Sequence, residues 1–324
     1  MKKQVYKSFR EIFIVATLFM VWACDKPSDA ERIPVIISTD IGGSDPDDFQ
    51  SMVHLLVYAD RLDIKGLISS PPHDGRATHI LEAIEAYEED YPNLVAQNEH
   101  FPSPDYLREV TKQGAIDAQE TAVPTQLSEG AQWIIHQAKR TEEPLYVLVW
   151  GSMTDVAQAL YVAPDIKKTL RVYSIGSWNT VQDSLSRNYV YSHHQDLWWI
   201  ESNTTFRGMY MGGYQEKDYG NLSFVEAHIK GHGALGDLFY TQKKDIKMGD
   251  TPSVLYLLDG DPNNPEGDSW GGAYIPTGHG PQYWTDNLAD SLIENNRPGA
   301  KTVNKYRKAY LDDWAHRMKW LKEK

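Results

Sequence analysis

Apolar positions along this chain fall into blocks of two kinds. A short run that is apolar on both faces comes first, as in residues 34–39, and a stretch with helical spacing follows, as in residues 52–59. Strands of this kind, separated by helices, indicate a parallel sheet that is covered on both sides. The pattern predicts strands over 34–39, 64–69, 145–150 and 170–175, and helices over 52–59, 76–89, 128–140 and 153–161.

The fold class that follows is α/β, a Rossmann-like, mostly parallel sheet with helices on both faces. Three of the predicted strands end in Asp40, in Gly151 or in Gly176. In open α/β sheets the ligand crevice lies outside the carboxyl ends of the strands, so these residues are expected at a site. No internal repeat interrupts residues 33–324, which we interpret as one domain.

The last apolar pattern predicts a helix over residues 302–322. Tyr306, Tyr310, Trp314 and Met318 recur along one side of it. Large side chains at this spacing are typical of a helix face that packs against a core. We therefore expect the stripe to be buried rather than to bind a ligand.

The first 23 residues have the pattern of a lipoprotein signal peptide. Four basic residues precede an apolar run over 12–23, which is short for a membrane span and ends at Cys24, the only cysteine. The sequence around Cys24 resembles a bacterial lipobox, in which that cysteine carries the lipid. We predict a signal peptide over 1–23, a polar tether over 24–32, and an exported lipoprotein of the cell envelope that contacts membrane only through its anchor.

Composition narrows the classes of partner. The formal net charge is −13, whereas binding to nucleic-acid phosphates needs a basic surface, so nucleic acid is not expected as a partner. The chain holds 10 Trp and 19 Tyr, and aromatic side chains suit the faces of sugars as well as protein cores.

The densest chemistry follows the first predicted strand, in Ser-Thr-Asp-Ile-Gly-Gly-Ser-Asp-Pro-Asp-Asp. Asp40, Asp45, Asp47 and Asp48 place four carboxylates within nine residues. Such like charge is unfavourable unless a cation neutralises it or a proton is retained. The lack of His and Cys argues against zinc and favours a hard cation such as Ca²⁺. Helix capping would explain one of these residues, but it does not explain all four.

These residues resemble the opening of the nucleoside hydrolases, whose acidic residues bind Ca²⁺ and activate water. They are closer to a nucleoside hydrolase-like domain family that is also labelled cellulose-binding, in which Asp-Pro-Asp-Asp is followed by Gln-Ser. The resemblance covers essentially all of residues 33–324. It continues through Gly66-Leu-Ile, Val149-Trp-Gly151, Tyr173-Ser-Ile-Gly176, Arg207-Gly-Met-Tyr210, Gly249-Asp-Thr-Pro-Ser253 and Trp270-Gly-Gly272.

The resemblance implies a role for each matching position. Asp40, Asp48 and Asp250 correspond to calcium ligands, together with the backbone carbonyl of Trp150. Asp47 corresponds to the base that takes a proton from the attacking water. Asp45 lies in an insertion relative to the family motif, where it would support a ligand or serve as an alternative base.

Substrate contacts are expected after the fourth predicted strand. Asn188 matches an asparagine that holds a sugar hydroxyl, and Trp178 and Asn179 are further candidates for substrate binding. In the nucleoside hydrolases a His precedes the late Asp and helps the nucleobase leave, but Gly249 stands at that position here. The candidate acids that remain are His193 and His194, which we rank first, and then His232 and His279.

The leading hypothesis is a Ca²⁺-dependent hydrolase of a glycosidic or N-ribosidic bond that acts on extracytoplasmic sugars or oligosaccharides. Calcium can polarise a water beside a sugar diol, and a carboxylate can act as the base. Two alternatives stay open. One is a carbohydrate-binding surface lipoprotein without activity, and the other is a lyase or dehydratase that acts on oligosaccharides containing uronic acid. The sequence also leaves a homo-oligomer open.

Overall fold

The computed structural model describes residues 32–43, 46–71, 74–119 and 123–322. The predicted signal peptide, Cys24 and nearly all of the tether lie outside these ranges, as does Asp45. No helix within the described ranges has the length and apolar character that crossing a membrane requires.

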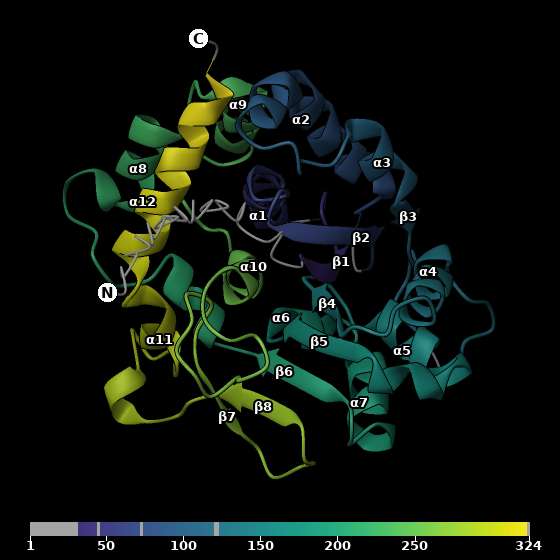
Figure 1. Cartoon of the computed structure of the whole chain (residues 1–324). Coiled ribbons are helices and arrows are strands. Elements are labelled where there is room, and N and C mark those ends of the chain that lie inside the picture. The colour runs from purple at the N-terminus through teal and green to yellow at the C-terminus, as the bar shows by residue number, and fades with distance from the viewer. Residues whose placement is uncertain (1–31, 44–45, 72–73, 120–122, 323–324) are drawn as a thin grey trace, which may run out of the picture. The chain divides into compact units, whose positions relative to one another are not determined.

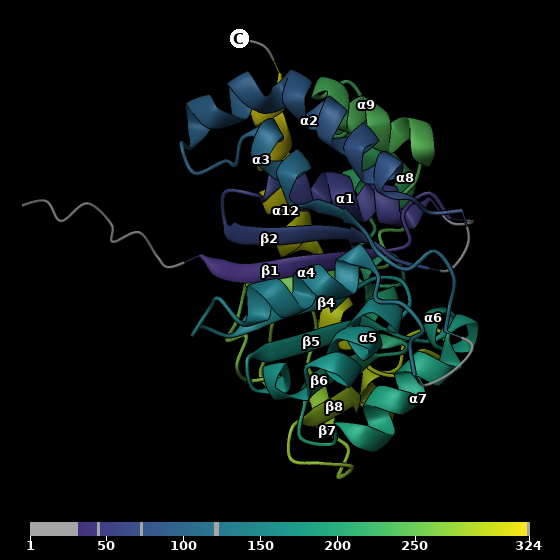
Figure 2. The same cartoon turned by 90° about the vertical axis from the view of Figure 1, so that its right-hand side faces the viewer.

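One eight-stranded sheet organises the described chain, in the order β3-β2-β1-β4-β5-β6-β8-β7 (Figures 1 and 2). All neighbouring pairs are parallel except β7 and β8. The predicted α/β class, with a mostly parallel sheet, is therefore confirmed. The strands are β1 Ile33–Thr39, β2 Leu62–Ser69, β3 Thr111–Gln113, β4 Leu145–Val149, β5 Leu170–Ile175, β6 Trp198–Ser202, β7 Tyr274–Pro276 and β8 Tyr283–Asp286.

Helices cover both faces of the sheet (Figure 1). The α-helices are α1 Asp47–Val57, α2 Ala77–Gln97, α3 Pro104–Glu109, α4 Glu129–Ala138, α5 Thr154–Val162, α6 Trp178–Gln182, α7 Ser184–His193, α8 Asn221–His228, α9 Gly233–Gln242, α10 Thr251–Leu258, α11 Ala300–Asn304 and α12 Arg307–Met318. The 3₁₀-helices are η1 Pro164–Lys168, η2 Thr205–Met209, η3 Lys217–Tyr219, η4 Asp290–Leu292 and η5 Lys319–Leu321.

The alternation of side chains along each strand separates two hydrophobic cores. Val35 and Ile37 of β1 pack into the core that contains α1, α2, α10 and α12, whereas Ile36 packs into the core of α4 and α5. Successive strand residues point to opposite faces, so a central strand must be apolar throughout to fill both cores. The need to fill both cores explains the continuous apolar runs in the sequence.

The ends of several elements differ from the prediction. The second helix reaches Gln97, although it contains Pro92, and the predicted C-terminal helix is divided into α11 and α12. Ser128 caps α4 as predicted, because its side chain accepts a hydrogen bond from the backbone N–H of Ala131. Tyr310, Trp314 and Met318 are buried, which confirms that this part of the aromatic stripe packs into the core.

The order of the strands fixes where a site can form. From β1 the chain adds β2 and β3 on one side, and it then crosses over to place β4 on the other side. Such a switch point separates the loops that leave two adjacent strands and opens a crevice at their carboxyl ends. Asp40 follows β1 and Trp150 follows β4, so both residues stand at this crevice.

Candidate active site

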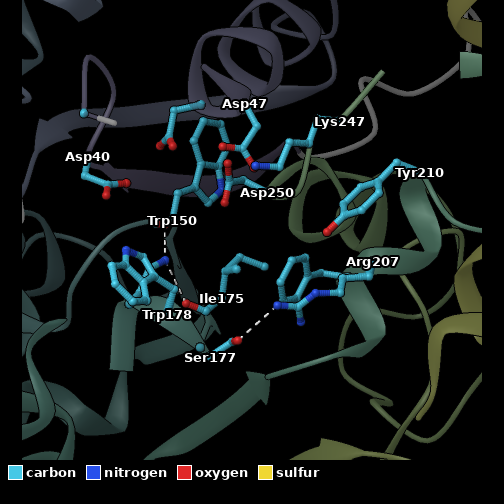
Figure 3. Close-up of a pocket in the computed structure, with 15 residues that line it drawn as sticks. Asp40, Asp47, Trp150, Ile175, Ser177, Trp178, Arg207, Tyr210, Lys247 and Asp250 are labelled. Carbon is cyan, nitrogen blue, oxygen red and sulfur yellow. Dashed lines mark hydrogen bonds between the residues drawn. The ribbon is translucent and has the colours of Figure 1, made fainter. Parts of the chain in front are cut away.

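A cavity of about 260 Å³ opens at the switch point (Figure 3). Its walls come from the loops after β1, β4 and β5, from the start of α1, from η2 and from the segment that leads into α10. Drug-sized ligands usually occupy roughly 300–1,000 Å³, so this cavity is suited to a smaller group such as one sugar ring.

Three carboxylates converge in the cavity. Asp47, Asp48 and Asp250 each offer an oxygen that lies within 4.8 Å of the other two. Asp47 and Asp48 form the first turn of α1, and Asp250 is the N-cap residue of α10, so two helix N-termini point their positive ends at this group. Two oxygens that are each about 2.4 Å from one Ca²⁺ ion can be at most roughly 4.8 Å apart, so the spacing fits a single ion.

The hydrogen bonding of these carboxylates also leaves room for a cation. Thr39 donates a hydrogen bond to Asp48 Oδ1. Asp250 is 3 % exposed, and its Oδ2 atom has no hydrogen-bond partner among the described residues. An unsatisfied buried carboxylate oxygen costs free energy that a hard cation would offset. The donor set therefore fits a hard cation such as calcium, and Asp47, Asp48 and Asp250 are the residues that would hold it.

This group differs from the predicted one in a single member. The sequence predicted that Asp40, Asp48 and Asp250 would converge, whereas the structure brings Asp47, not Asp40, into the group within 4.8 Å. Asp40 still lines the cavity. Asp40 is also hydrogen-bonded to Asp48, so it lies directly beside the group. The carbonyl of Trp150, the other predicted ligand, accepts a hydrogen bond from Asn179 Nδ2 at 2.5 Å.

Burial makes these carboxyls hard to ionise without a cation. Burial and then the charge of Asp47 raise the pKa of Asp40 to about 7, and burial and then Asp48 raise the pKa of Asp47 to about 7. Burial also raises the pKa of Asp48 and of Asp250 well above the ordinary value, and a neighbouring carboxylate adds to it in each case. A bound cation would remove both penalties, because it neutralises the mutual repulsion and ligates the ionised form.

Gly249 lies against the carboxylate of Asp47. A Cβ atom at this position would lie 2.7 Å from Asp47 Oδ2, which is closer than van der Waals contact allows. The preceding residue, Met248, is fully buried with a φ of 43°, a conformation that residues other than glycine rarely adopt. A histidine at position 249 would therefore displace the carboxylate that is predicted to be the base.

The predicted histidines lie away from this cavity. Within the described residues, no histidine lines it. His193 and His194 end α7, where His193 stacks on Tyr189 and His194 Nε2 lies 3.4 Å from the Tyr189 hydroxyl. His232 is the N-cap residue of α9, and His279 stacks on Tyr191.

The predicted sugar ligands are divided between two places. Asn188 lies on α7 outside the cavity lining, and its Oδ1 accepts a hydrogen bond from Arg187. Trp178 and Asn179 begin α6 and do line the cavity. Asn179 donates to the carbonyls of Trp150 and Ile175 and so holds two strand ends together. Trp178 is 58 % exposed at the rim, where a sugar ring could stack on it.

Sequence reasoning missed the cationic side of the cavity. Arg207, Tyr210 and Lys247 line it from η2 and from the segment before α10. Arg207 and Tyr210 stand within a motif that carries the family resemblance, so the signal was present. Their approach to the acidic group depends on the packing of η2, which the sequence does not show.

The fold and the cavity together define an α/β protein of the nucleoside hydrolase-like class. The chain belongs to the family described as cellulose-binding Sde182, nucleoside hydrolase-like domain, whose model matches residues 34–274. This confirms the resemblance that the acidic motif carried. Among curated proteins, none is significantly similar in sequence.

Solved structures agree with this assignment. A nucleoside hydrolase-related protein from Saccharophagus degradans, described as associated with carbohydrate metabolism, is 25% identical with a TM-score of 0.71, covering 90% of this chain and 72% of its own. The inosine-uridine preferring nucleoside hydrolase from Bacillus anthracis is 15% identical with a TM-score of 0.53, covering 88% and 99%. A plant nucleoside hydrolase is 12% identical with a TM-score of 0.54, covering 89% and 99%. The last two similarities concern the fold alone.

Proposed function

We propose that this protein is a calcium-dependent hydrolase that cleaves a glycosidic or N-ribosidic bond in an extracytoplasmic sugar or oligosaccharide. The observation that carries the proposal is the convergence of Asp47, Asp48 and Asp250 within 4.8 Å in a cavity of about 260 Å³. The relation to nucleoside hydrolases and the similarity to a protein associated with carbohydrate metabolism support the class of reaction and of substrate.

Each residue of the cavity can be assigned a role in such a reaction. A bound calcium ion supplies positive charge that polarises water and sugar hydroxyls. Asp47, Asp48 and Asp250 would hold the ion, and Asp47 would also accept the proton of the attacking water. The carboxylates also stabilise the positive charge that develops at the anomeric carbon. No described histidine lines the cavity, so candidates to donate a proton to the leaving group there include Tyr210 and Lys247.

A substrate screen tests this function. In the presence of CaCl₂, we expect cleavage of O-linked sugars, supplied as aryl glycosides and polysaccharide-derived oligosaccharides, to exceed cleavage of inosine and uridine. The reason is that Gly249 leaves no side chain to orient or protonate a nucleobase. EGTA should abolish the activity. Efficient cleavage of inosine or uridine would show that the leaving group is a nucleobase after all.

A second candidate function is carbohydrate binding without catalysis. The exposed indole of Trp178 beside the acidic group favours it, since such a ring binds a sugar face whether or not a bond is broken. The description of the family as cellulose-binding points the same way. Calcium-dependent binding of sugars with no cleavage across the screen would support this function instead.

We also propose that the mature protein begins at Cys24 and is anchored in the cell envelope through a lipid. Metabolic labelling with a fatty-acid analogue should mark the wild-type protein and should leave the Cys24→Ser variant unlabelled. The wild-type protein should also fractionate with membranes. Labelling that persists in Cys24→Ser, or an unprocessed wild-type chain in the soluble fraction, would contradict the lipoprotein assignment.

A further inference from the structure

The cavity contains an arginine whose charge is not matched by an acid. Arg207 is half-buried, and its guanidinium donates to the Asn203 carbonyl at 2.7 Å. It also donates to the Ser177 hydroxyl at 3.1 Å (Figure 3). Both acceptors are neutral. Among the described residues, no Asp or Glu forms an ion pair with Arg207, although a partly buried guanidinium usually has one.

The acid whose charge acts on Arg207 forms its hydrogen bonds elsewhere. Asp286 accepts hydrogen bonds from the backbone N–H groups of Asn203, Thr204 and Thr205, at 2.9 to 3.1 Å, and so satisfies the start of η2. Its charge raises the pKa of Arg207, but among the described residues it forms no ion pair with that guanidinium. Asp286 therefore acts on Arg207 without binding it directly.

A second arginine adds to the unmatched charge. Arg297 is close enough that its charge lowers the pKa of Arg207, behind the larger effect of burial, and it also acts on Tyr210. The Nε atom of Arg297 is buried and has no hydrogen-bond partner among the described residues. Two guanidinium groups that repel each other, neither of them in an ion pair with a described acid, are typical of a place where an anion binds.

The surroundings of Arg207 hold its guanidinium in one orientation. Its Cζ atom lies 4.4 Å from the centroid of the Phe206 ring. Ser177, which accepts one of its hydrogen bonds, has a φ of 60°, and the Ser177 N–H donates to Asn203 Oδ1 at 3.0 Å. Backbone strain of this kind persists where surrounding contacts enforce it, and it is common at ligand sites. The donors of Arg207 that remain unused are thus fixed before a ligand arrives.

We propose, on the basis of the proposed function, that the substrate is an anionic sugar whose acidic group binds to Arg207, with the charge of Arg297 in support, while its hydroxyls face Asp47, Asp48 and Asp250. In Figure 3 Arg207 and Tyr210 lie on one wall of the cavity and Asp40 on the opposite wall. One sugar ring of a size suited to the cavity would reach both sides. The acidic group is the carboxylate of a uronic acid or a sulfate ester, and both present the oxygens that guanidinium groups bind.

Isothermal titration calorimetry with three matched probes tests this inference. The wild-type protein in CaCl₂ is titrated with galactose, galacturonate and galactose 6-sulfate. We expect at least one anionic probe to bind at least ~10-fold more tightly than galactose, a difference of about 1.4 kcal/mol. The tighter of the two anions identifies the acidic group. Raising the NaCl concentration should weaken the binding of that anion more than the binding of galactose, because salt screens charge.

Single variants locate the effect. Arg207→Gln should lose the preference for the anion, Arg297→Gln should weaken that preference, and both variants should retain the affinity for calcium. Arg207→Lys should recover part of the preference, because it keeps the charge without the planar guanidinium. Arg140→Gln, which removes an exposed arginine from the end of α4, is the matched control and should bind like the wild type. Thermal unfolding of each variant shows whether a loss reflects misfolding.

The outcomes separate this inference from the proposed function. If the wild type binds all three probes equally, or if the preference survives in both glutamine variants, the anionic-sugar assignment is overturned even when neutral glycosides are cleaved. If an anionic probe binds through the two arginines and no glycoside is hydrolysed in CaCl₂, the substrate class stands and hydrolysis is overturned.

Discussion

Asp47→Asn should lower turnover on a verified substrate by at least ~10²-fold, the loss that follows when a positioned general base is removed. The amide keeps the shape of the carboxylate but cannot accept the proton of the attacking water. Asp48 and Asp250 retain their charges, so calcium affinity should fall much less than turnover. Rates at saturating CaCl₂ and calcium titrations on the same preparations measure the two effects separately.

Two further variants make this result interpretable. Asp48→Asn should weaken calcium binding first and turnover through it, because Asp48 is buried within the acidic group. Asp259→Asn alters an exposed carboxylate at the opposite end of α10 from Asp250 and should behave like the wild type. If Asp47→Asn turned over substrate at the wild-type rate, Asp47 would be removed from the mechanism and another group would have to act as the base.

Calcium should stabilise the protein strongly at pH 8 and weakly at pH 5. Without the ion, the pKa of Asp40 and of Asp47 is about 7 in the folded protein, against roughly 3.9 in an unfolded chain. Between these values the unfolded chain releases protons that the folded protein keeps, so the free energy of unfolding falls as the pH rises from about 4 to about 7. Calcium needs the ionised carboxylates, and its effect is therefore greatest above pH 7.

Thermal unfolding in CaCl₂ or EGTA at the two pH values measures this effect. At a calcium concentration of about 100 times Kd, mass action stabilises the folded protein by about 2.7 kcal/mol at pH 8. Asp250→Asn should lose most of this gain, and Asp259→Asn should keep it. An equal gain at pH 5 and pH 8 would mean that calcium binds to carboxylates that are already ionised, contrary to the effect of burial on this group.

The acidic motif and the fold class were both predictable because they depend on local sequence. A strand of a parallel sheet that is buried on both faces must be apolar throughout. The apolar run over residues 34–39 therefore predicts a strand without knowledge of the strands that pair with it. Asp47 and Asp48 follow a turn and begin a helix, and their crowding with other acids favours a bound cation or a retained proton wherever that helix lies. Asp250 could be predicted only through its resemblance to a family motif.

The sequence did not show which residues, distant along the chain, lie next to these acids. His193 and His194 follow the fourth predicted strand, yet α7 carries them away from the cavity, because the direction of a helix depends on its packing rather than on its place in the chain. The same packing brings Arg207 and Arg297, 90 positions apart, close to each other. The sequence thus determined the sheet and the acids at its edge. The tertiary structure alone decided that Asp47 joins Asp48 and Asp250, and that arginines face them, because long-range contacts set those positions.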